Sequence, residues 1–455
     1  MSLSLRDYLE PGTRVHLVGI GGVSMSALGE VLKDRGIDIT GSDMNVSDTV
    51  LKLRKNGITV FEGHDARNIE GCACVIRTAA ARDDNPEIQA ARSRNIPVFE
   101  RAQAWGVIMS DYRDVICFSG THGKTTSSSM CTQIFLEAGL DPTVMIGGTV
   151  PFMGGSYRVG QGSAMIAEAC EYCNSFLNFC PTVAVINNIE GDHLDFFKDL
   201  DDIKNSFRRF SQLVPERGRV IINADDPGAA DVGKSLAKRP LYFGFGDSAD
   251  VRGVNYREDG GLPRFDVYVG GELYTHVELA VRGRHNAYNA LAALSAASVL
   301  GVDGQAAGTA LGHFTGAERR LQFKGRFNGA DIYDDYAHHP GELKALFDTA
   351  MNMGYKRVIC VFQPHTYSRT KALLEDFIEQ LSRPDLTVLA KIYAAREKDT
   401  IGVSSEDIRS GIGNALYFET FGEIEDFLRS TAGEGDLILT VGAGNIYQVG
   451  EALLK

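Results

Sequence analysis

The chain has 455 residues, and its 59 acidic and 46 basic side chains give a formal net charge of −13. Hydrophobic residues make up 44% and charged residues 23%, which is typical of a folded globular protein, and the length predicts about three domains. The acidic excess argues against a protein dedicated to nucleic acid or to anionic membranes. No segment approaches the ~18 consecutive apolar residues of a transmembrane helix, so we expect no membrane insertion. Eight cysteines are too few for a disulfide scaffold and favour a cytoplasmic setting.

Apolar runs along the chain predict buried parallel strands. Three of them lead into a glycine turn and then a helical pattern, at 15–22, 115–123 and 437–444. Further runs lie at 183–189, 220–223, 358–362 and 388–393. Continuous apolar runs that alternate with helical patterns are typical of an α/β fold whose parallel sheets are buried on both faces. Ligands of such sheets bind beyond the carboxyl ends of the strands, which is where the glycine turns lie.

The domain boundaries are placed where the patterns change, which gives segments 1–110, 111–315 and 316–455. Within the second segment, residues 245–285 alternate apolar and polar side chains. This alternation predicts strands with one exposed face, and the Gly270–Gly271 pair predicts a hairpin turn between two of them. The central segment is therefore expected to carry an antiparallel insertion.

The first glycine turn, Gly19-Ile-Gly21-Gly22-Val-Ser24, nearly matches the dinucleotide-binding fingerprint. Ser24 stands where the fingerprint has its third glycine, and Asp43 follows where a ribose-binding acid would stand. On these residues alone, three interpretations are equally open: a nicotinamide cofactor, a different nucleotide, or a tight structural turn.

The second turn, residues 119–126 (SGTHGKTT), has the pattern of a phosphate-binding loop, although Phe118 replaces the first consensus glycine. Its glycines let backbone N–H groups approach phosphate oxygens, and the helix that follows adds a positive N-terminal end. Lys124 would reach the β- and γ-phosphates of ATP, and the Thr125 hydroxyl would bind Mg²⁺. We therefore expect ATP to bind along the loop, at Gly120, Thr121, His122, Gly123, Lys124, Thr125 and Thr126.

Acids and imidazoles at strand ends are candidate metal ligands, because phosphoryl transfer needs metal charge near the phosphates. Glu168 ends the run 164–168, and Glu171 follows it closely. The run 183–189 leads into Glu190-Gly-Asp-His193. A carboxylate and an imidazole at the ends of neighbouring strands suit one or two Mg²⁺ ions.

Eight ordered segments give the chain a resemblance to the Mur ligases, the ATP-dependent amide-forming enzymes that build the peptidoglycan stem peptide. They are GIGGVSMSALG (19–29), GSD (41–43), SGTHGKTT (119–126), EACEY (168–172), NNIEGDHLD (187–195), GRHNAYNALAAL (283–294), DDYAHHP (334–340) and FQPHTYSRT (362–370). The resemblance covers nearly the whole chain. It implies a Rossmann-like UDP-binding domain, a central domain with a P-loop ATPase-type parallel sheet, and a C-terminal Rossmann-like domain.

The resemblance also implies a reaction. ATP would phosphorylate the lactyl carboxylate of UDP-N-acetylmuramate, and the amino group of L-alanine would displace the phosphate from this acyl phosphate. The first glycine turn and the segments 334–340 and 362–370 favour L-alanine as the amine. A ligase of the same family that reattaches recycled tripeptide is the alternative. ATP and two Mg²⁺ ions are the implied cofactors, and the enzyme would be a monomer or a homodimer.

The catalytic roles implied by the resemblance fall on the central domain. Thr125 and Glu168 would hold the first Mg²⁺ and His193 the second, while Lys124 neutralises charge on the phosphates. Several relatives carry a carbamylated lysine about fifteen residues farther along the chain, where this sequence has Phe207 and Arg208. His193 would therefore hold its ion with less help than in those relatives.

Further residues would bind ATP by the same resemblance. Asn286 and Asn289 would face the adenine, although capping of a helix explains two asparagines here equally well. Arg320 would reach the phosphates, although without the resemblance it is as readily a surface charge. Asp335 would bind the ribose.

The substrates would be bound by the two outer domains. The diphosphate of the UDP-sugar would be held by Gly21, Gly22 and Ser24, and its uridine by Ser42 and Asp43. The first turn would thus bind a nucleotide without nicotinamide. The amine substrate would lie near Tyr336 and either His338 or His339. The alanine carboxylate or the acyl-phosphate oxygens would be bound by His365 and Arg369.

Overall fold

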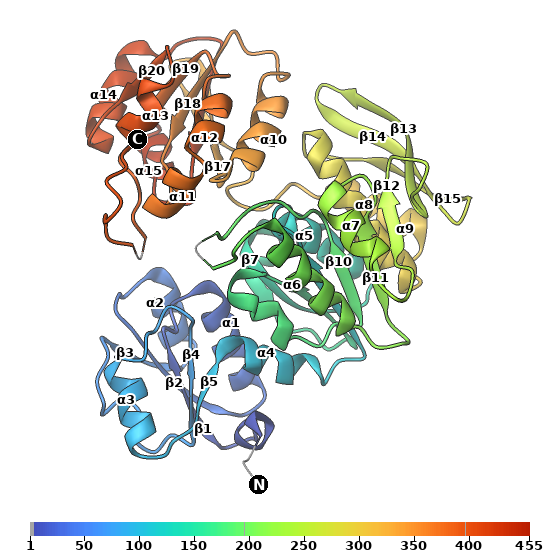
Figure 1. Ribbon diagram of the computed structural model, residues 1–455, viewed down its shortest axis with the longest axis vertical. Helices are drawn as coiled ribbons and strands as arrows, with labels where there is room; N and C mark the ends of the chain where they lie inside the picture. The colour runs from blue at the N-terminus through green and yellow to red at the C-terminus, as the bar shows by residue number, and fades with distance from the viewer. Residues whose placement is uncertain (1–3, 195, 396) are drawn as a thin grey trace.

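The computed structural model describes residues 4–194, 196–395 and 397–455. Its three β-sheets follow one another along the chain, and in Figure 1 they are blue, cyan to yellow, and orange to red. Helices pack around each sheet, so the predicted three-domain α/β architecture is confirmed. The boundaries after residues 110 and 315 stay our proposal. Asp195, which ends the segment 187–195, lies outside the described residues.

The first sheet holds five parallel strands in the order β3-β2-β1-β4-β5. The chain builds one half of the sheet, returns past its first strand and builds the other half, as in a Rossmann-like fold. The strands are β1 (Arg14–Val18), β2 (Asp38–Asp43), β3 (Thr59–Glu62), β4 (Cys74–Arg77) and β5 (Val98–Glu100). The helices are η1 (Leu5–Tyr8, a 3₁₀ helix), α1 (Val23–Asp34), α2 (Asp48–Lys55), α3 (Pro86–Ser93) and α4 (Arg101–Met109).

The central sheet has ten strands in the order β15-β14-β13-β12-β11-β10-β6-β9-β7-β8. Pairing is parallel from β7 to β13 and antiparallel at both edges. The strands are β6 (Asp114–Ser119), β7 (Thr143–Val150), β8 (Gly155–Arg158), β9 (Ala164–Glu168), β10 (Val183–Ile186), β11 (Arg219–Asn223), β12 (Leu241–Gly244), β13 (Val251–Asp259), β14 (Leu262–Val269) and β15 (Glu272–Glu278). The helices are α5 (Lys124–Glu137), α6 (Leu200–Gln212), α7 (Pro227–Lys234), α8 (Arg284–Val299) and α9 (Gly304–His313), with 3₁₀ helices η2 (Pro151–Met153) and η3 (Tyr172–Asn178).

The predicted antiparallel insertion is present at one edge of this sheet. Strands β14 and β15 are joined at Gly270–Gly271, and Val269 pairs with Glu272 across the turn. Along β14 the side chains of Phe265 and Val267 are buried and their neighbours are less so, as the alternation predicts. The hairpin therefore extends the parallel sheet, and its buried side chains share a core with those of α8 and α9.

The third sheet has six strands in the order β16-β17-β21-β18-β19-β20, and all pairs except β16–β17 are parallel. Its strands are β16 (Gln322–Phe327), β17 (Ala330–Asp335), β18 (Arg357–Phe362), β19 (Leu386–Leu389), β20 (Ala415–Tyr417) and β21 (Asp436–Val441). Its helices are α10 (Pro340–Ala350), α11 (Tyr367–Ala372), α12 (Leu374–Leu381), α13 (Ser405–Ser410), α14 (Phe421–Thr431) and α15 (Tyr447–Leu453). Within the described ranges, no helix is both long and apolar enough to cross a membrane.

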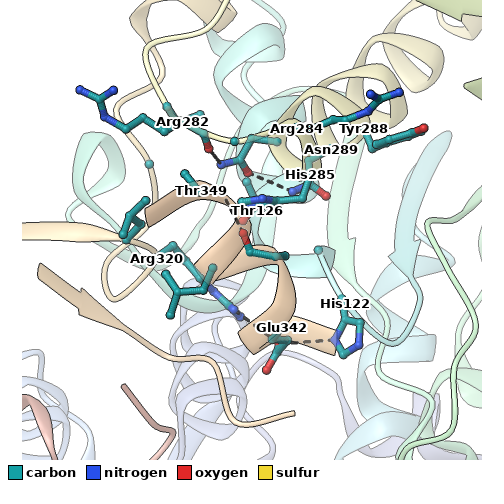
Figure 2. Close-up of a pocket in the computed structure, with 18 of the residues that line it drawn as sticks. His122, Thr126, Arg282, Arg284, His285, Tyr288, Asn289, Arg320, Glu342 and Thr349 are labelled. Carbon is teal, nitrogen blue, oxygen red and sulfur yellow. Dashed lines mark hydrogen bonds and ion pairs between the residues drawn. The ribbon is translucent and has the colours of Figure 1, made fainter. Parts of the chain in front are cut away.

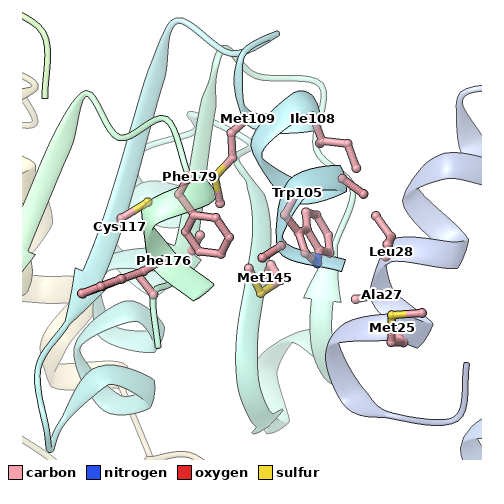
Figure 3. Close-up of a cluster of buried hydrophobic side chains, with 14 of the residues drawn as sticks. Met25, Ala27, Leu28, Trp105, Ile108, Met109, Cys117, Met145, Phe176 and Phe179 are labelled. Atoms are coloured by element: carbon pink, nitrogen blue, oxygen red, sulfur yellow. The ribbon is translucent and has the colours of Figure 1, made fainter. Parts of the chain in front are cut away.

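One continuous hydrophobic core joins the first and central domains (Figure 3). Trp105 of α4 is 1% exposed and lies in a cluster with Leu28 of α1 and Met145 of β7. Its indole N–H donates to Ser24 Oγ at 3.1 Å. Because Ser24 lies in the first turn of α1, this bond fixes the first glycine turn to α4, and the shared core with Met145 links both to the central domain.

Helix α6 carries an aromatic cluster where several relatives have a lysine. Phe207 is fully buried, and its ring centre lies 5.3 Å from that of Phe176. Phe176 in turn stacks on Phe210 at 4.5 Å. Position 207 is therefore part of the apolar core and offers no metal ligand.

Candidate functional site

A cleft of about 1160 Å³ lies between the central and third domains. Figure 2 shows His122 of the phosphate loop, His285 and Asn289 of α8, and Arg320 and Glu342 of the third domain around it. Many of the residues predicted to bind ATP line this cleft: His122, Gly123, Thr126, Asn286, Asn289, Arg320 and Asp335. Three segments that are far apart in the sequence are thus brought to one cavity.

The phosphate loop is held by asparagine side chains of neighbouring elements. The His122 N–H donates to Asn188 Oδ1 at 2.7 Å. Gly123 has a φ of +80°, and a Cβ at this position would lie 2.3 Å from Asn289 Oδ1. Glycine is therefore required at 123, both by the backbone conformation and by the close approach of α8.

Lys124 is the first residue of α5, and its ammonium group is directed back over the loop. It donates to the backbone carbonyls of Gly120 and Thr121, the latter at 3.0 Å, and lies 3.3 Å from Glu171 Oε2. Burial by itself lowers the pKa of Lys124, but the Glu171 carboxylate and other acids of the site raise it above the usual lysine value. Lys124 therefore carries a full positive charge at neutral pH.

Thr125 and Glu168 come together as the sequence predicted. The Thr125 hydroxyl donates to Glu168 Oε2 at 2.8 Å, and the Gly147 N–H donates to the same oxygen at 2.8 Å. The strand end of β9 and the first turn of α5 thus present a hydroxyl and a carboxylate side by side. These are the hard oxygen donors that Mg²⁺ prefers.

His193 lies on the loop that follows β10, with a φ of +54°. Its Nε2 is 3.6 Å from Asp192 Oδ2, and its ring centre is 4.6 Å from that of Tyr172. Burial lowers the pKa of His193 below its usual value, although Asp192 acts in the opposite direction. The imidazole is therefore neutral at pH 7, which is the form that binds a metal ion.

The α8 asparagines have partners within the central domain. Asn286 donates through Nδ2 to the Arg282 carbonyl at 2.7 Å. Asn289 donates to Asn286 Oδ1 at 3.1 Å and accepts from the Ser127 hydroxyl at 3.1 Å. Both side chains also line the cleft, so each hydrogen-bonds within the central domain and borders the cavity.

The third domain adds a partly buried ion pair to the cleft. Arg320 Nη1 lies 3.6 Å from Glu342 Oε1. Burial opposes the charge of each partner, yet the pKa of Arg320 is raised and that of Glu342 is well below its usual range, because opposite charges surround them. Asp335 accepts the N–H groups of Leu321 and Ala337, both at 2.7 Å, and burial raises its pKa to about 6.

The two histidines of the segment 334–340 face different partners. His338 Nδ1 lies 3.0 Å from the Tyr336 carbonyl, and its ring centre is 5.8 Å from that of His365. Burial lowers the pKa of His338 to about 4, so it is neutral. His339 caps α10, and its ring centre is 5.0 Å from that of His122. His338 thus belongs with the residues predicted near the amine, and His339 lies against the phosphate loop.

Arg369 links the third domain to the central one. Its Nη2 lies 3.2 Å from Asp192 Oδ1, and its Nη1 is 3.3 Å from His365 Nδ1. Burial opposes ionisation of Asp192, but Arg369, His193 and His339 together hold the pKa of that carboxyl below its usual range. The predicted pair His365 and Arg369 is therefore assembled, and it borders the loop that carries His193.

The first glycine turn forms a separate site in the first domain. The Gly21 N–H donates to Asp43 Oδ2 at 2.9 Å. Ser42 is fully buried, and its hydroxyl donates to Glu87 Oε2 at 2.7 Å. Together with Ser24, which accepts from Trp105, these predicted substrate-binding side chains hold the turn and its sheet together. Their role toward a nucleotide stays a prediction, as does that of Gly22.

His285 and Glu342 are among the titratable residues of the cleft that received no role from the sequence. His285 is on α8 and is exposed within the cleft. Glu342 lies in the first turn of α10, where an acid is ordinary because it complements the helix dipole. Its proximity to His122 and Arg320 depends on how two domains meet, so the sequence held no signal for it.

The three Mur ligase domains match the chain in order. The catalytic domain of the Mur ligase family matches residues 14–113, the Mur ligase middle domain residues 118–297, and the Mur ligase glutamate ligase domain residues 319–444.

Individual relatives match over nearly the full length of both chains. The UDP-N-acetylmuramate–L-alanine ligase of Caldanaerobacter subterraneus subsp. tengcongensis is 44% identical over 453 residues, which cover 98% of each chain. That of Clostridium novyi is 45% identical over 446 residues, which cover 97% of each. The crystal structure of UDP-N-acetylmuramate–alanine ligase from Thermotoga maritima has a TM-score of 0.82 at 28% identity and covers 97% of this chain and 98% of that one. The chain belongs to the Mur ligase family.

Proposed function

We propose that this chain joins L-alanine to the lactyl carboxylate of UDP-N-acetylmuramate, driven by ATP and through an acyl phosphate, in peptidoglycan precursor synthesis. The observation that carries the proposal is the phosphate loop, whose His122, Gly123 and Thr126 line a cleft together with Arg320 of the third domain, while Lys124 lies over the same loop. The full-length similarity to UDP-N-acetylmuramate–L-alanine ligases supports the choice of substrates.

The phosphate loop and Arg320 would serve the first chemical step. The lactyl carboxylate attacks the γ-phosphorus of ATP, the bond to the β-phosphate oxygen breaks, and ADP leaves. Both reactants are anionic, so cations fixed around them lower the barrier. The charged Lys124 ammonium and the N-terminal end of α5 would act from one side, and the Arg320 guanidinium from the other.

Two Mg²⁺ ions fit the donors that the central domain provides. Thr125 and Glu168 would hold the first ion through a hydroxyl and a carboxylate, and the neutral His193 would hold the second. When bound, Mg²⁺ would draw negative charge away from the phosphate oxygens. The acid at 171 has a different task, since it lies against Lys124 and keeps it charged.

The outer domains would bring the two organic substrates to this point. In the second step the alanine amino group attacks the acyl carbon, phosphate leaves, and the amine loses a proton. Arg369 with His365 would bind the alanine carboxylate, and the neutral His338 lies beside them with Tyr336. The first-domain turn would hold the UDP diphosphate.

Phosphate release from ATP tests the proposal. The full chain is assayed with UDP-N-acetylmuramate and an amino-acid panel that includes L-alanine, glycine, L-serine and the stem tripeptide. We expect release to require both UDP-N-acetylmuramate and L-alanine. Release that is independent of the amine would contradict ligation, and a preference for the tripeptide would assign the chain to the recycling reaction instead.

The setting of the enzyme is part of the same proposal. The eight cysteines are all free thiols, as expected for a reducing cytoplasm that also supplies ATP. We propose a monomer or a homodimer. Sedimentation of the purified chain across a range of concentrations distinguishes the two.

A further inference from the structure

Three potential metal ligands outside the proposed Mg²⁺ positions meet where the central and third domains touch. His122 belongs to the phosphate loop, Glu190 to the loop after β10, and His339 to the start of α10. One ligand atom from each lies within 4.8 Å of the others, and in the part of the chain that the structure describes this is the one such group of three His, Cys, Asp or Glu side chains.

Gly341 shows that the three atoms face a common space. A Cβ added to Gly341 would lie 2.7 Å from Glu190 Oε2, 3.0 Å from His122 Nε2 and 3.4 Å from His339 Nδ1. Any side chain at 341 would therefore collide with the group. Because Gly341 has no side chain, a small space remains beside it, bordered by Glu190 Oε2, His122 Nε2 and His339 Nδ1. We refer to this space as the cradle.

Each imidazole presents one ring nitrogen to the cradle, and a metal ion would replace the partners that these nitrogens now have. His122 Nε2 lies 3.3 Å from Glu190 Oε2. Burial opposes the charge of His122, but Glu190 and Glu342 raise its pKa to about 9, so metal binding would release its proton. His339 Nε2 lies 3.1 Å from the Gly191 carbonyl and donates to it, so the lone pair is on Nδ1, which faces the cradle. That Nδ1 now accepts the Gly341 N–H at 3.2 Å. His122 Nδ1 lies 3.5 Å from Glu342 Oε1, which leaves Nε2 directed at Glu190 (Figure 2 shows the side toward Glu342). A carbonyl or a carboxylate behind the ring is the usual support of a metal-binding histidine.

We propose that His122, Glu190 and His339 form a binding site for a transition-metal dication of the Zn²⁺ or Co²⁺ type. Two imidazoles and one carboxylate are the donor set that such ions take, whereas Mg²⁺ prefers oxygen alone. Because His122 and Glu190 also line the cleft, water or a phosphate oxygen can complete the coordination from that side. The site is separate from Thr125, Glu168 and His193.

A metal ion bound here would link the central domain to the third domain. Two of its ligands belong to the central domain and His339 to the third, so a bound ion ties the phosphate loop to α10. It would act beside the ion pair of Arg369 with Asp192, which joins the same two domains. Occupancy of the site therefore stabilises the arrangement in which the cleft is formed.

Cobalt absorption spectroscopy tests the site directly. The untagged full-length chain is titrated with Co²⁺ in excess Mg²⁺, which keeps oxygen-only sites filled, and the visible d–d bands are followed. We expect one Co²⁺ per chain, no thiolate charge-transfer band, and displacement by Zn²⁺. In Glu190→Gln the affinity for Co²⁺ should fall at least about tenfold, as is usual when the shell of a metal site is damaged.

Matched variants separate this site from others on the surface. The Glu190 side chain is 47% exposed, so its substitution should leave the fold intact, which circular dichroism and thermal unfolding check. His339→Gln should also lose the site. His276→Gln removes an exposed histidine that is paired with Asp266 on the hairpin and should bind Co²⁺ as the wild type does. Unchanged Co²⁺ affinity in Glu190→Gln, no Co²⁺ binding by the wild type, or bands of a thiolate complex would overturn the proposal.

Discussion

The β1–α1 turn of the first domain and the β6–α5 turn of the central domain share one sequence pattern, an apolar strand followed by glycines and a helix. They differ in the charged side chain that contacts the glycine turn itself. In the first turn the Gly21 N–H donates to the Asp43 carboxylate, so an acid lies against the backbone. In the second, Lys124 places an ammonium over the loop, and Arg320 lines the cleft in front of it.

The difference between the two turns shows that glycines alone do not determine what chemistry occurs at a turn. Glycines let a phosphate approach the backbone, but fixed charges decide whether a phosphoryl group can be transferred there. The first turn is anchored in a core shared with the central domain through Trp105. The second lies at the edge of a cleft between domains. The proposed binding site for the UDP-sugar and the proposed site of phosphoryl transfer thus begin from the same local pattern.

Lys124→Ala should give the largest effect, because it removes the cation that sets the second turn apart. We expect kcat/KM for phosphate release to fall about a thousandfold, or ~4 kcal/mol. The control is Lys391→Ala, which removes a 64% exposed lysine that is paired with Glu419. Near wild-type turnover in Lys124→Ala would mean that the charge difference between the turns has no part in catalysis.

Gly123→Ala should weaken ATP binding by about 2–3 kcal/mol, because the added Cβ meets Asn289 and the backbone has a positive φ. Titration calorimetry with ATP measures this loss. Gly139→Ala separates strain from collision, since Gly139 also has a positive φ but nothing lies within 4 Å of its Cβ position. It should lower stability by ~1 kcal/mol and leave ATP affinity unchanged. Equal ATP affinity in the two variants would show that the approach of α8 is unimportant.

Glu87→Gln should lower the stability of the first domain and leave ATP binding unchanged. Burial opposes its ionisation, but His16, Ser42 and Asn68 hold its pKa at about 2. The pKa of Glu87 is lower in the folded chain than the value of 4.5 in the unfolded chain, so the ionised carboxylate stabilises the fold fully at a pH above 4.5. This contribution is lost as the pH falls toward 2. Glu87→Gln should therefore cost about 2 kcal/mol at pH 7 and progressively less below pH ~4.5.

Urea unfolding followed at several pH values measures the Glu87 effect. Glu70→Gln, at an exposed position of the same domain, is the control. A loss of stability that is the same at pH 7 and pH 3 would contradict a role for the ionised carboxylate.

Asp43→Asn should give the smallest effect and bears on the first turn alone. The carboxylate orders the Gly21 N–H, so we expect the KM for UDP-N-acetylmuramate to rise about tenfold while kcat stays constant. Asp48→Asn, on the neighbouring helix α2, serves as the control. A fall in kcat instead would place the first turn in the reacting machinery and erase the distinction between the two turns.

Strands, glycine turns and the three-domain plan could be predicted because they depend on local pattern. An apolar run such as Val183–Ile186 is buried on both faces wherever it pairs, and a Gly-Gly pair makes a hairpin turn. The family resemblance placed Thr125 and Glu168 at one ion. In the structure they are adjacent because Glu168 ends β9 and Thr125 lies just after β6, its neighbour in the sheet.

The remaining features of the site depend on side-chain direction and on contacts between domains. Glu171 follows Glu168 closely, yet it lies against Lys124, because η3 turns the chain after β9. Adjacent histidines diverge, since His339 caps α10 while His338 lies beside Tyr336. The directions of these side chains could not be predicted from sequence periodicity, because each depends on segments that meet only in the folded chain.

The absence of a lysine at Phe207 bears on whether the activity depends on carbon dioxide. A lysine carbamate forms when dissolved carbon dioxide adds to an uncharged amine, so enzymes that carry one depend on the supply of carbon dioxide. Here the two candidate positions hold Phe207, whose ring packs on Phe176, and Arg208, which is paired with Asp231. The turnover of this chain should therefore be the same in buffers purged of carbon dioxide and in buffers saturated with it, and the step it catalyses would continue when that gas is scarce.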